Sequence, residues 1–442
     1  MCYIMKLMLT ALNIRKCVKS YTKHVEYIYT FLKTHYEKMN TGRLRQFRNP
    51  FGFKTFDKIG KEVIMVDLEQ SREEIDAIDK KIVELFERRM QVAKDVAEYK
   101  IQTGKKVLDK EREREKLETL KAMASNDFNR HGIQELFAQI MSMSRKLQYS
   151  LISSESYQIP FKEIDSLKSS KSLKVMCFGK RGSYSEQAME EYFGTDITRF
   201  YASSFKQVMQ AVKEGEVEYG VLPIENTSTG GISDIYDLLV EFDNYIIGEH
   251  VMKIEHALLG LPGAKVENIR KVYSHAQGLA QCSKYIENHP YMTPVECIST
   301  ADSAKKVLED GDLSQGAIAG KQAAAYYGLS VLEEGVNHES SNSTRFIIIS
   351  REKKYLKGAN KVSICFELPH ASGTLYNMLS HFIYNNLNMT KIESRPVPGK
   401  VFEYRFFVDF EGSLQEAGVK NALYGIKEEA ISFKILGSYK SI

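Results

Sequence analysis

The sequence predicts a multidomain chain, in which an all-helical segment precedes a two-lobed α/β segment and a small α+β segment. Three observations lead to this fold class. A long stretch repeats apolar residues at helical spacing, short apolar strands then alternate with helical patterns, and a strand–helix–strand–strand–helix–strand order closes the chain. The length of 442 residues fits about three domains.

The long helix is predicted from Ser71 to Ile101. Its apolar residues form one stripe: Ile75, Ile78, Ile82, Leu85, Phe86, Val92, Ala93 and Val96. Ser71 fits a capping box, Asp67 is a rival start, and Gly104 supplies the stop. At 1.5 Å per residue this helix is roughly 50 Å long, more than a compact domain of this size buries by itself. We therefore expect it to need a partner.

The apolar stripe also carries cations. Arg89 lies seven residues from both Ile82 and Val96, and Lys100 follows on the same face. Taken alone, each cation fits a snorkelling side chain or an interhelix salt bridge as well as an anion site. Arg72 lies seventeen residues before Arg89, roughly 25 Å away along the axis, so only a second, antiparallel copy brings it close.

Two further helices complete this segment. Asp109 is placed to cap a short charged helix, and a third helix is predicted from about Gly132 to Leu151. From about Val66 to Ile152 the chain resembles the all-helical chorismate mutase family, in the order and spacing of eight polar residues: Arg72, Arg89, Lys100, Asp109, Arg112, Glu113, Ser144 and Gln148. The resemblance implies an interlocked homodimer in which Arg72 serves the other subunit's site.

The same resemblance implies that chorismate rearranges to prephenate without a nucleophile, metal or redox cofactor. Such a site must hold the reactive conformer and stabilise charge at the breaking ether bond. Its arginines suit the two carboxylates of chorismate. Lys100 and Gln148 are the expected donors near the ether oxygen, whereas Asp109, Glu113 and Ser144 contact the substrate hydroxyl or brace the cations.

Charge is divided unevenly along the chain. Residues 1–64 hold 13 Lys and Arg against 4 Asp and Glu, whereas the remainder holds 48 against 53. The basic extension fits a nucleic-acid arm, a membrane-surface segment or an organellar transit peptide. It has neither a strong serine and arginine bias nor a clear cleavage site. We therefore expect the functional chain to start near Met65 and the extension to be dispensable.

The cysteines and the hydropathy narrow the class of protein further. The six cysteines form no CxxC pair or zinc spacing, which favours a reduced cytoplasm. No apolar run approaches the length of a membrane span. We expect a cytoplasmic enzyme with no nucleic-acid or membrane partner.

The middle of the chain alternates strands and helices after a linker at Ser153 to Ser172. The predicted strands are Leu173 to Phe178, Glu218 to Leu222, Ile269 to Tyr273, Val295 to Ser299, Gly316 to Ala319 and Arg345 to Ile349. Helical patterns separate them at Phe205 to Lys213 and Ala301 to Glu309. In such folds the sites lie at strand ends.

Polar loops stand at those strand ends, at residues 179–185, 222–231, 273–277 and 341–346. A single Gly-rich hydroxyl loop would fit phosphate binding equally well. The four together resemble prephenate dehydratase from about Leu173 to Ser350, with Pro223 to Ser228 and Thr344 to Phe346 the closest matches. Lys180 stands where that family usually has a proline.

The dehydratase resemblance implies that prephenate loses carbon dioxide and water to give phenylpyruvate. Thr344 would bond the leaving hydroxyl and Arg345 would hold a carboxylate. A threonine hydroxyl is a weak acid, so either Glu225 or a water relay is the ultimate proton donor. Other expected cleft residues are Ser183, Asn226, Thr227, Ser228, Ser274, Gln277 and Phe346. His275 fits a structural and a catalytic role equally.

The last segment, residues 361–442, is predicted as a ferredoxin-like sandwich. Its elements are Val362 to Leu368, Gly373 to Asn386, Met389 to Val397, Val401 to Phe410, Leu414 to Ile426 and Phe433 to Leu436. It resembles the ACT regulatory domain of prephenate dehydratases. The ESRP motif is Glu393, Ser394, Arg395 and Pro396, and the GALV motif is partly kept as Gly373, Thr374, Leu375 and Tyr376. The resemblance implies feedback inhibition by phenylalanine between paired C-terminal domains.

The combined expectation is a cofactor-free homodimeric or larger enzyme that acts on chorismate and then on prephenate. No GxGxxG motif follows a strand, which argues against a fused dehydrogenase. Arogenate dehydratase remains open, because its substrate differs only by an amine. A non-catalytic α/β module that senses an aromatic acid also remains open.

Overall fold

The computed structural model describes residues 67–167, 172–339 and 341–441. The basic extension, with Cys2 and Cys17, lies outside the described residues. Within the described ranges, no helix is long and apolar enough to cross a membrane.

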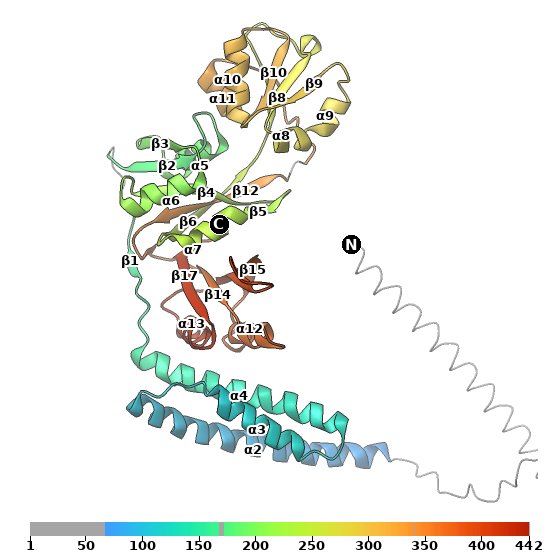
Figure 1. Cartoon of the computed structure of the whole chain (residues 1–442), viewed down its shortest axis with the longest axis vertical. Helices are drawn as coiled ribbons and strands as arrows, with labels where there is room; N and C mark the ends of the chain where they lie inside the picture. The colour runs from blue at the N-terminus through green and yellow to red at the C-terminus, as the bar shows by residue number, and fades with distance from the viewer. Residues whose placement is uncertain (1–66, 168–171, 340, 442) are drawn as a thin grey trace, which may run out of the picture. The chain divides into compact units, whose positions relative to one another are not determined.

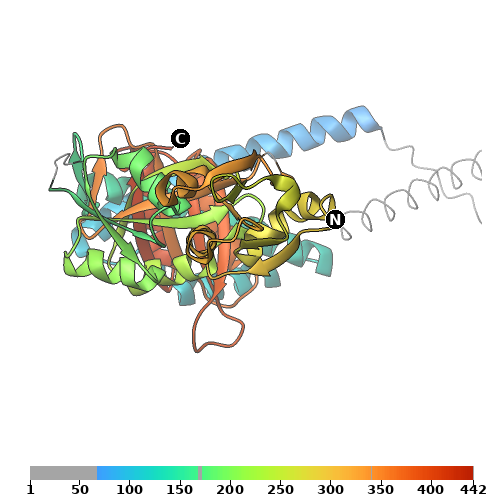
Figure 2. The same cartoon turned by 90° about the horizontal axis from the view of Figure 1, so that it is seen from above.

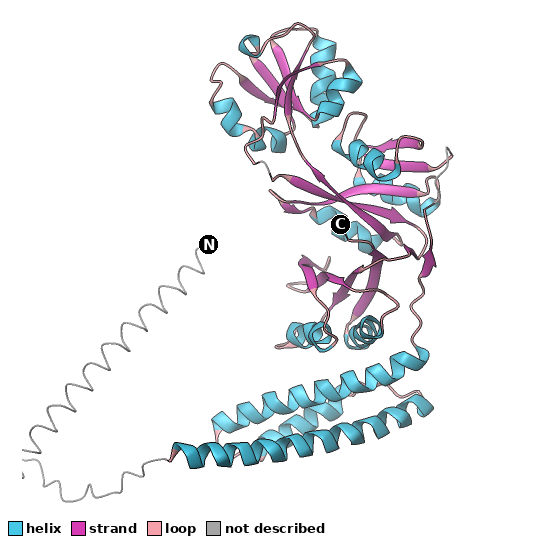
Figure 3. Cartoon of the chain, turned by 180° about the vertical axis from the view of Figure 1, so that it is seen from behind, coloured by secondary structure: helices cyan, strands magenta, loops and turns pink. Residues whose placement is uncertain are grey.

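The first described segment is entirely helical, as predicted (Figure 3). Its helices are α2 (Leu68–Thr103), α3 (Lys110–Ala122) and α4 (Asp127–Ser156), and α2 is one continuous helix (Figure 2). The backbone N–H groups of Glu69 and Gln70 donate to Asp67 Oδ1 at 2.9 and 3.3 Å. Asp67 therefore caps α2, so the rival start is correct and the capping box at Ser71 is wrong.

The first lobe of the α/β region is a mixed sheet in the order β6–β12–β4–β2–β3. Its strands are β2 (Lys174–Phe178), β3 (Thr198–Ala202), β4 (Tyr219–Asn226), β6 (Tyr245–Lys253) and β12 (Ser343–Ser350), with the short β5 (Gly230–Gly231) beside β4. Strand β12 runs antiparallel to both neighbours. One face packs against α5 (Tyr184–Phe193), and the other packs against α6 (Phe205–Glu214) and α7 (Ser233–Glu241).

The second lobe is a five-stranded sheet in the order β11–β7–β10–β8–β9. Figure 1 labels β8, β9 and β10 of this sheet. Its strands are β7 (Ala257–Gly260), β8 (Lys271–Ser274), β9 (Thr293–Glu296), β10 (Gln315–Ala319) and β11 (Ser330–Glu334). Its helices are α8 (Ala276–Gln281), α9 (Ser283–Glu287), α10 (Thr300–Asp310) and α11 (Lys321–Tyr327), with the 3₁₀ turn η1 (Val266–Asn268). The sequence predicted β8 and β10, placed β9 a few residues late, and missed the antiparallel strands β7 and β11.

The chain crosses between the lobes twice, once between β6 and β7 and again between β11 and β12. The two crossovers bond to each other, because Ile254 N donates to Asn342 O at 2.8 Å and Val336 N donates to His256 O at 3.0 Å. Thr344 lies two residues beyond the second crossover's Asn342. The predicted two-lobed architecture therefore holds, and its junction carries the start of β12.

The expected linker at Ser153 to Ser172 holds regular structure. Helix α4 continues to Ser156, and β1 (Lys162–Ile164) pairs in parallel with β13 (Lys354–Leu356). Serine and charge do not exclude structure here, because the helix and the strand obtain hydrogen-bonding and packing partners from elsewhere in the chain.

The C-terminal segment is the predicted βαββαβ sandwich. Its elements are β14 (Lys361–Glu367), α12 (Thr374–Tyr384), β15 (Met389–Pro396), β16 (Tyr404–Glu411), α13 (Ala417–Glu429) and β17 (Ser432–Tyr439). The antiparallel order is β15–β16–β14–β17. Strand β17 also pairs with β6 of the first lobe at Gly437 and Ile246, which makes the two sheets continuous.

Candidate functional site

Thr344 and Asn226 meet where β12 and β4 pair in antiparallel register. Asn226 Nδ2 donates to Thr344 Oγ1 at 2.9 Å and to Asn342 Oδ1 at 2.8 Å. Both Thr344 and Asn226 are buried. Because the threonine oxygen accepts from the amide, its own O–H stays available to donate to a bound molecule.

The loop after β4 folds back onto the same point. Ser228 Oγ donates to Asn342 Oδ1 at 3.1 Å, and Ser228 N donates to Asn226 Oδ1 at 2.9 Å. Thr227 Oγ1 donates to Ser341 O at 3.2 Å and accepts from Ser343 N at 3.0 Å. The structure thus brings together the predicted Asn226, Thr227, Ser228 and Thr344.

Two contacts join polar loops of the first lobe to the second lobe. Gln277, at the start of α8, donates from Nε2 to Thr229 Oγ1 at 3.1 Å. Lys180, in the glycine-rich loop of the first lobe, places Nζ 2.5 Å from Asp302 Oδ1 in α10. The predicted Gln277 therefore lies at the site, and polar loops of both lobes face one another there.

Several other predicted cleft residues have structural partners instead. Ser274 is fully buried and donates to Ile318 O at 2.7 Å inside the second lobe, and Phe346 lies in the apolar core against α5. Ser183 caps α5 by accepting from Glu186 N at 3.3 Å. His275 caps α8, since its Nδ1 accepts from Gln277 N at 3.2 Å, which favours its structural role. The prediction that Ser274 and Phe346 line the cleft is corrected by their burial.

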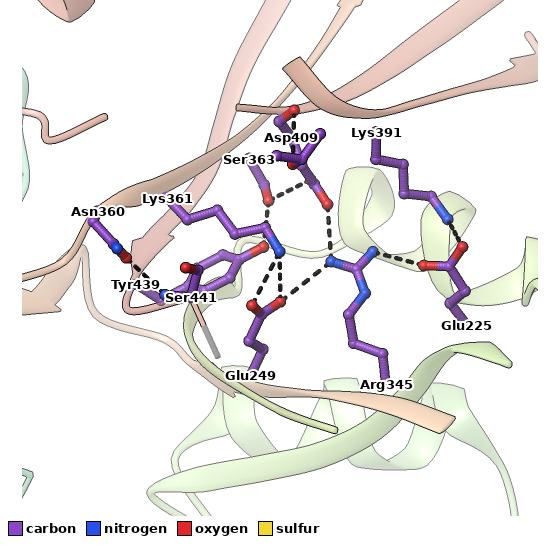
Figure 4. A network of polar contacts seen from close by, with 11 residues as sticks. Glu225, Glu249, Arg345, Asn360, Lys361, Ser363, Lys391, Asp409, Tyr439 and Ser441 are labelled. Carbon is purple, nitrogen blue, oxygen red and sulfur yellow. Dashed lines mark hydrogen bonds and ion pairs between the residues drawn. The ribbon is translucent and has the colours of Figure 1, made fainter. Parts of the chain in front are cut away.

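Arg345 points to the opposite face of the sheet from Thr344, because successive side chains of a strand alternate. Its guanidinium lies 3.1 Å from Glu225 Oε2, 2.9 Å from Asp409 Oδ2 and 3.3 Å from Glu249 Oε2 (Figure 4). The sequence led us to expect Arg345 on a substrate carboxylate and Glu225 as an acid beside Thr344. Instead, the two residues pair with each other against the C-terminal sandwich.

This ion network continues into β14 and β15. Lys361 Nζ lies 2.8 Å from Glu249 Oε2, and Lys391 Nζ lies 2.6 Å from Glu225 Oε1. Each carboxylate therefore has a cation, which is how buried charges are tolerated. Burial alone would lower the pKa of Arg345, but Asp409 and Glu249 raise it above its ordinary value.

A second group of polar residues gathers on the three helices. Arg89 of α2 donates through Nη1 to Ser144 Oγ and, at 3.3 Å, to Ile140 O of α4. Lys100 Nζ donates to Val107 O at 2.7 Å. Burial lowers the pKa of both Arg89 and Lys100, and the charge of Glu113 on α3 partly offsets this effect. These cations of α2 and the acid of α3 therefore lie within electrostatic reach of one another.

The other predicted members of this group differ in their burial and in their contacts. Asp109 caps α3 as predicted, because its Oδ1 accepts from Arg112 N at 3.1 Å. Gln148 is 6% exposed, and its Oε1 has no hydrogen-bond partner among the described residues. A buried polar atom of this kind calls for a ligand or water. The side chain of Arg112 on α3 is exposed. The side chain of Arg72, in the opening turns of α2, is exposed as well.

The C-terminal motif lies against the first lobe. Arg395 of β15 binds Asp237 of α7 through two contacts, Nη2 to Oδ2 at 2.7 Å and Nε to Oδ1 at 3.3 Å. Glu393 is half-buried on the same side of β15, while Ser394 and Pro396 are exposed. Gly373 precedes α12 with a φ of 78°, a conformation that favours glycine.

Sequence reasoning missed the partners of these residues. Asn342 had a usable signal, because it stands two positions before Thr344 and so shares its strand face. Asp237 and Asp302 had none, because each lies far along the sequence from the residue that it contacts. A cavity of about 220 Å³ beside the first crossover was also missed; Tyr184, Lys253 and Lys321 are among its lining residues, and no predicted site residue is.

Two protein families match the chain, one over its helical segment and one over its α/β region. Residues 71–149 match the type II chorismate mutase family, and residues 175–354 match the prephenate dehydratase family. The bifunctional chorismate mutase/prephenate dehydratase of Pseudomonas aeruginosa is 33% identical over 84% of this chain and 97% of its own length.

Two solved structures each resemble 61% of this chain. One is the prephenate dehydratase of Arthrobacter aurescens in complex with L-Phe, at a TM-score of 0.57 and 30% identity, covering 61% of this chain and 90% of that one. The other, GqqA, is described as a novel type of quorum-quenching acylase, with the same TM-score of 0.57 and 30% identity over 61% of this chain and 98% of that one.

The match to the Pseudomonas relative runs through both parts in the same order and leaves little of that relative uncovered. The residues gathered on the three helices and at the start of β12 fall within the two matched family ranges. The chain therefore belongs to the family of bifunctional chorismate mutase/prephenate dehydratases.

Proposed function

We propose that this chain carries out two consecutive steps of phenylalanine biosynthesis. The helical segment, residues 65–152, rearranges chorismate to prephenate. The two-lobed region, residues 173–350, then converts prephenate to phenylpyruvate. The observation that carries the proposal is the hydrogen bond from Asn226 to Thr344 at the lobe junction, in a chain that also gathers Arg89, Lys100 and Glu113 on three helices.

In the mutase, Arg89 and Lys100 offer positive charge to a dianionic substrate from one side of α2. We assign Arg89 and Arg112 to the carboxylates, and Lys100 and Gln148 to the ether oxygen. The unpartnered Oε1 of buried Gln148 and the lowered pKa of Lys100 support a desolvated, polar site. Asp109, Glu113 and Ser144 orient these cations or bind the substrate hydroxyl.

In the dehydratase, the O–H of Thr344 donates to the hydroxyl that leaves the ring. Asn226 supports this role, because its amide occupies the acceptor side of the threonine oxygen. Thr227, Ser228 and Gln277 contribute further polar groups from both lobes. We assign the ultimate proton to a water relay, because Glu225 is engaged by Arg345 and Lys391.

The C-terminal sandwich, residues 361–442, acts in this proposal as an ACT regulatory domain that binds phenylalanine. Its strand order, the half-buried Glu393 and the αL glycine Gly373 support this role. The similar Arthrobacter dehydratase, described in complex with L-Phe, supports the choice of ligand. Residues Thr374, Leu375, Ser394, Arg395 and Pro396 complete the expected site.

We also propose a cytoplasmic enzyme that is at least a homodimer. On the apolar stripe of α2, the exposed fraction is 52% for Ile82, 67% for Leu85 and 54% for Val92. Exposed apolar residues in this pattern favour burial against a second copy. In that dimer Arg72 reaches the site of the other subunit.

One experiment separates the proposed function from its rivals. The purified chain is supplied in turn with chorismate, prephenate and arogenate, and phenylpyruvate or phenylalanine is measured by absorbance and chromatography. Phenylpyruvate from both chorismate and prephenate supports the proposal. Product from arogenate alone indicates the arogenate enzyme. Prephenate that accumulates from chorismate, with no product from either prephenate or arogenate, indicates a non-catalytic α/β module.

A further inference from the structure

Arg145 lies on α4 directly after the mutase residue Ser144, and its side chain lies between the mutase residues and the C-terminal sandwich. Its Nη1 lies 2.6 Å from Glu113 Oε2 on α3, and its Nε lies 2.9 Å from Glu429 Oε1 on α13 of the C-terminal sandwich. The Arg145 side chain is 9% exposed. One guanidinium therefore joins an acid of the mutase group to an acid of the C-terminal sandwich.

The surrounding contacts show that α13 and α12 pack on this face of α4. The ring of Tyr149, fully buried, lies 5.6 Å from the ring of Tyr424 and 6.0 Å from that of His381. Lys146 Nζ donates to Ser380 Oγ at 2.7 Å. Helix α4 thus carries Ser144 and Gln148 on one side and the C-terminal sandwich on the adjacent side.

Arg145 is fixed by Glu429 on one side and holds Glu113 on the other. Glu429 is largely buried, and although burial raises its pKa, His381 and Arg145 lower it to about 2, so it stays ionised. Glu429 therefore anchors Arg145 from the C-terminal side. Glu113 also lies within electrostatic reach of Arg89 and Lys100, whose pKa values it raises against the effect of burial.

A carboxylate this close to the substrate-binding cations competes with the substrate's own carboxylates unless another cation holds it. We propose that Arg145 is a positioning residue of the mutase site. It holds Glu113 where this carboxylate can bind the substrate hydroxyl without pairing directly with Arg89 or Lys100, and Glu429 makes this depend on the docking of α13 onto α4. The inference rests on the proposed mutase function. It adds a contact through which the C-terminal sandwich acts on the mutase.

The first test is kinetic. Arg145→Met should raise the KM for chorismate far more than it lowers kcat, with kcat/KM falling by about 10²-fold, the scale of a misplaced binding group. Arg145→Lys, which reaches one carboxylate instead of two, should recover part of the loss. Dehydration of added prephenate should stay unchanged and serves as the measure of folding.

A double-mutant cycle identifies Glu113 as the group that Arg145 controls. In a Glu113→Gln background, Arg145→Met should raise the KM no further, because no competing carboxylate is left. An equal rise in both backgrounds would overturn the proposal. If the wild type consumes no chorismate, the mutase function itself fails. If the wild type consumes chorismate and the Arg145 variants have the same KM as the wild type, the function stands and this inference fails.

Glu429→Gln tests the link from the C-terminal side and does not disturb the mutase helices directly. It should raise the KM for chorismate several-fold and leave prephenate dehydration unchanged. Glu428→Gln is the matched control, because its carboxylate precedes Glu429 on α13 and forms no ion pair among the described residues. If Glu429→Gln leaves the KM for chorismate unchanged, the proposed link between the C-terminal sandwich and the mutase is overturned. This result would count even if Arg145→Met does not fold.

Discussion

Thr344 and Arg345 are adjacent on β12 and serve opposite faces of one sheet. The Thr344 oxygen accepts from Asn226 at the lobe junction, whereas the Arg345 guanidinium lies among Glu225, Glu249 and Asp409. The strand that presents the proposed catalytic hydroxyl is therefore held from behind by an ion network shared with the C-terminal sandwich. Asp409 of the C-terminal sandwich therefore contacts the residue next to Thr344 on the same strand.

Removing the Thr344 hydroxyl should abolish most of the dehydratase activity. Thr344→Val keeps the shape of the side chain but cannot donate, and we expect kcat to fall by about 10² to 10³, the scale of a lost transition-state donor. Thr344→Ser should retain activity. Prephenate consumption measures the effect, and unchanged mutase activity is the control; a fully active Thr344→Val would exclude the hydroxyl from the reaction.

Lys100→Ala should affect the mutase alone. A donor near the ether oxygen is worth about 3 to 4 kcal/mol of transition-state stabilisation, so chorismate consumption should nearly stop while added prephenate is still dehydrated. Lys105→Ala, on an exposed lysine beyond the end of α2, is the control. Loss of both reactions in a folded protein would contradict the separation of the two sites.

Mixed dimers test whether Arg72 serves the other subunit. Arg72→Ala and Lys100→Ala proteins should each be inactive as mutases. When they are unfolded together and refolded, half of the sites in a mixed dimer are intact, so mutase activity should return in part. Mixed dimers shown by mass spectrometry but without activity would mean that each site is built from one chain.

Phenylalanine binding should depend on β15. Calorimetric titration should detect binding to the full chain, and Glu393→Gln should weaken it, because a half-buried carboxylate suits an ammonium group. Inhibition of the dehydratase should weaken in parallel, since a ligand shifts activity only by its differential affinity for two states. Glu403→Gln, on the loop after β15, is the control, and equal affinities for all three proteins would place the effector elsewhere.

The pH dependence of stability should report the Glu429 contact. The pKa of Glu429 is lowered to about 2, so its contribution is complete above the ordinary glutamate range near 4.3 and is lost as pH falls towards 2. Relative to Glu429→Gln, the wild type should be more stable at pH 5 by at most about 3 kcal/mol, and this advantage should fade towards pH 2. Thermal midpoints measure it, and a constant difference across that range would contradict the lowered pKa.

The elements that the sequence predicted correctly are those whose signal lies in neighbouring residues. The helices and the βαββαβ order were read from periodicity, and Asp109 from its position before a charged helix. The cap of α2 was misassigned to Ser71 because Asp67 and Ser71 carry equally good local signals, and only the backbone path decides between them. The antiparallel strands β7 and β11 were missed because they are short and depend on pairing across the lobe.

The site residues that were predicted correctly also had a local signal, whereas those that were missed depend on distant segments of the chain. Asn226, Thr227, Ser228, Gln277 and Thr344 came together because their loops end neighbouring elements. Arg345 and Glu225 did not join them, because a one-residue step along a strand reverses the face. The partners of Arg145 and Arg395 depend on the docking of distant segments, about which neither periodicity nor spacing carries information.

The pairing of β17 with β6 has a practical consequence for anyone who wishes to remove the C-terminal sandwich. Without β17, the backbone groups of β6 around Ile246 would lose their partner, and this edge of the sheet would be open to pairing with another molecule. Leu436 and Tyr439 would also leave the apolar core that they share with α6 and α7. A chain cut near Tyr355 should therefore aggregate, and loss of its feedback control would be indistinguishable from misassembly, whereas single substitutions on β15 leave that edge covered.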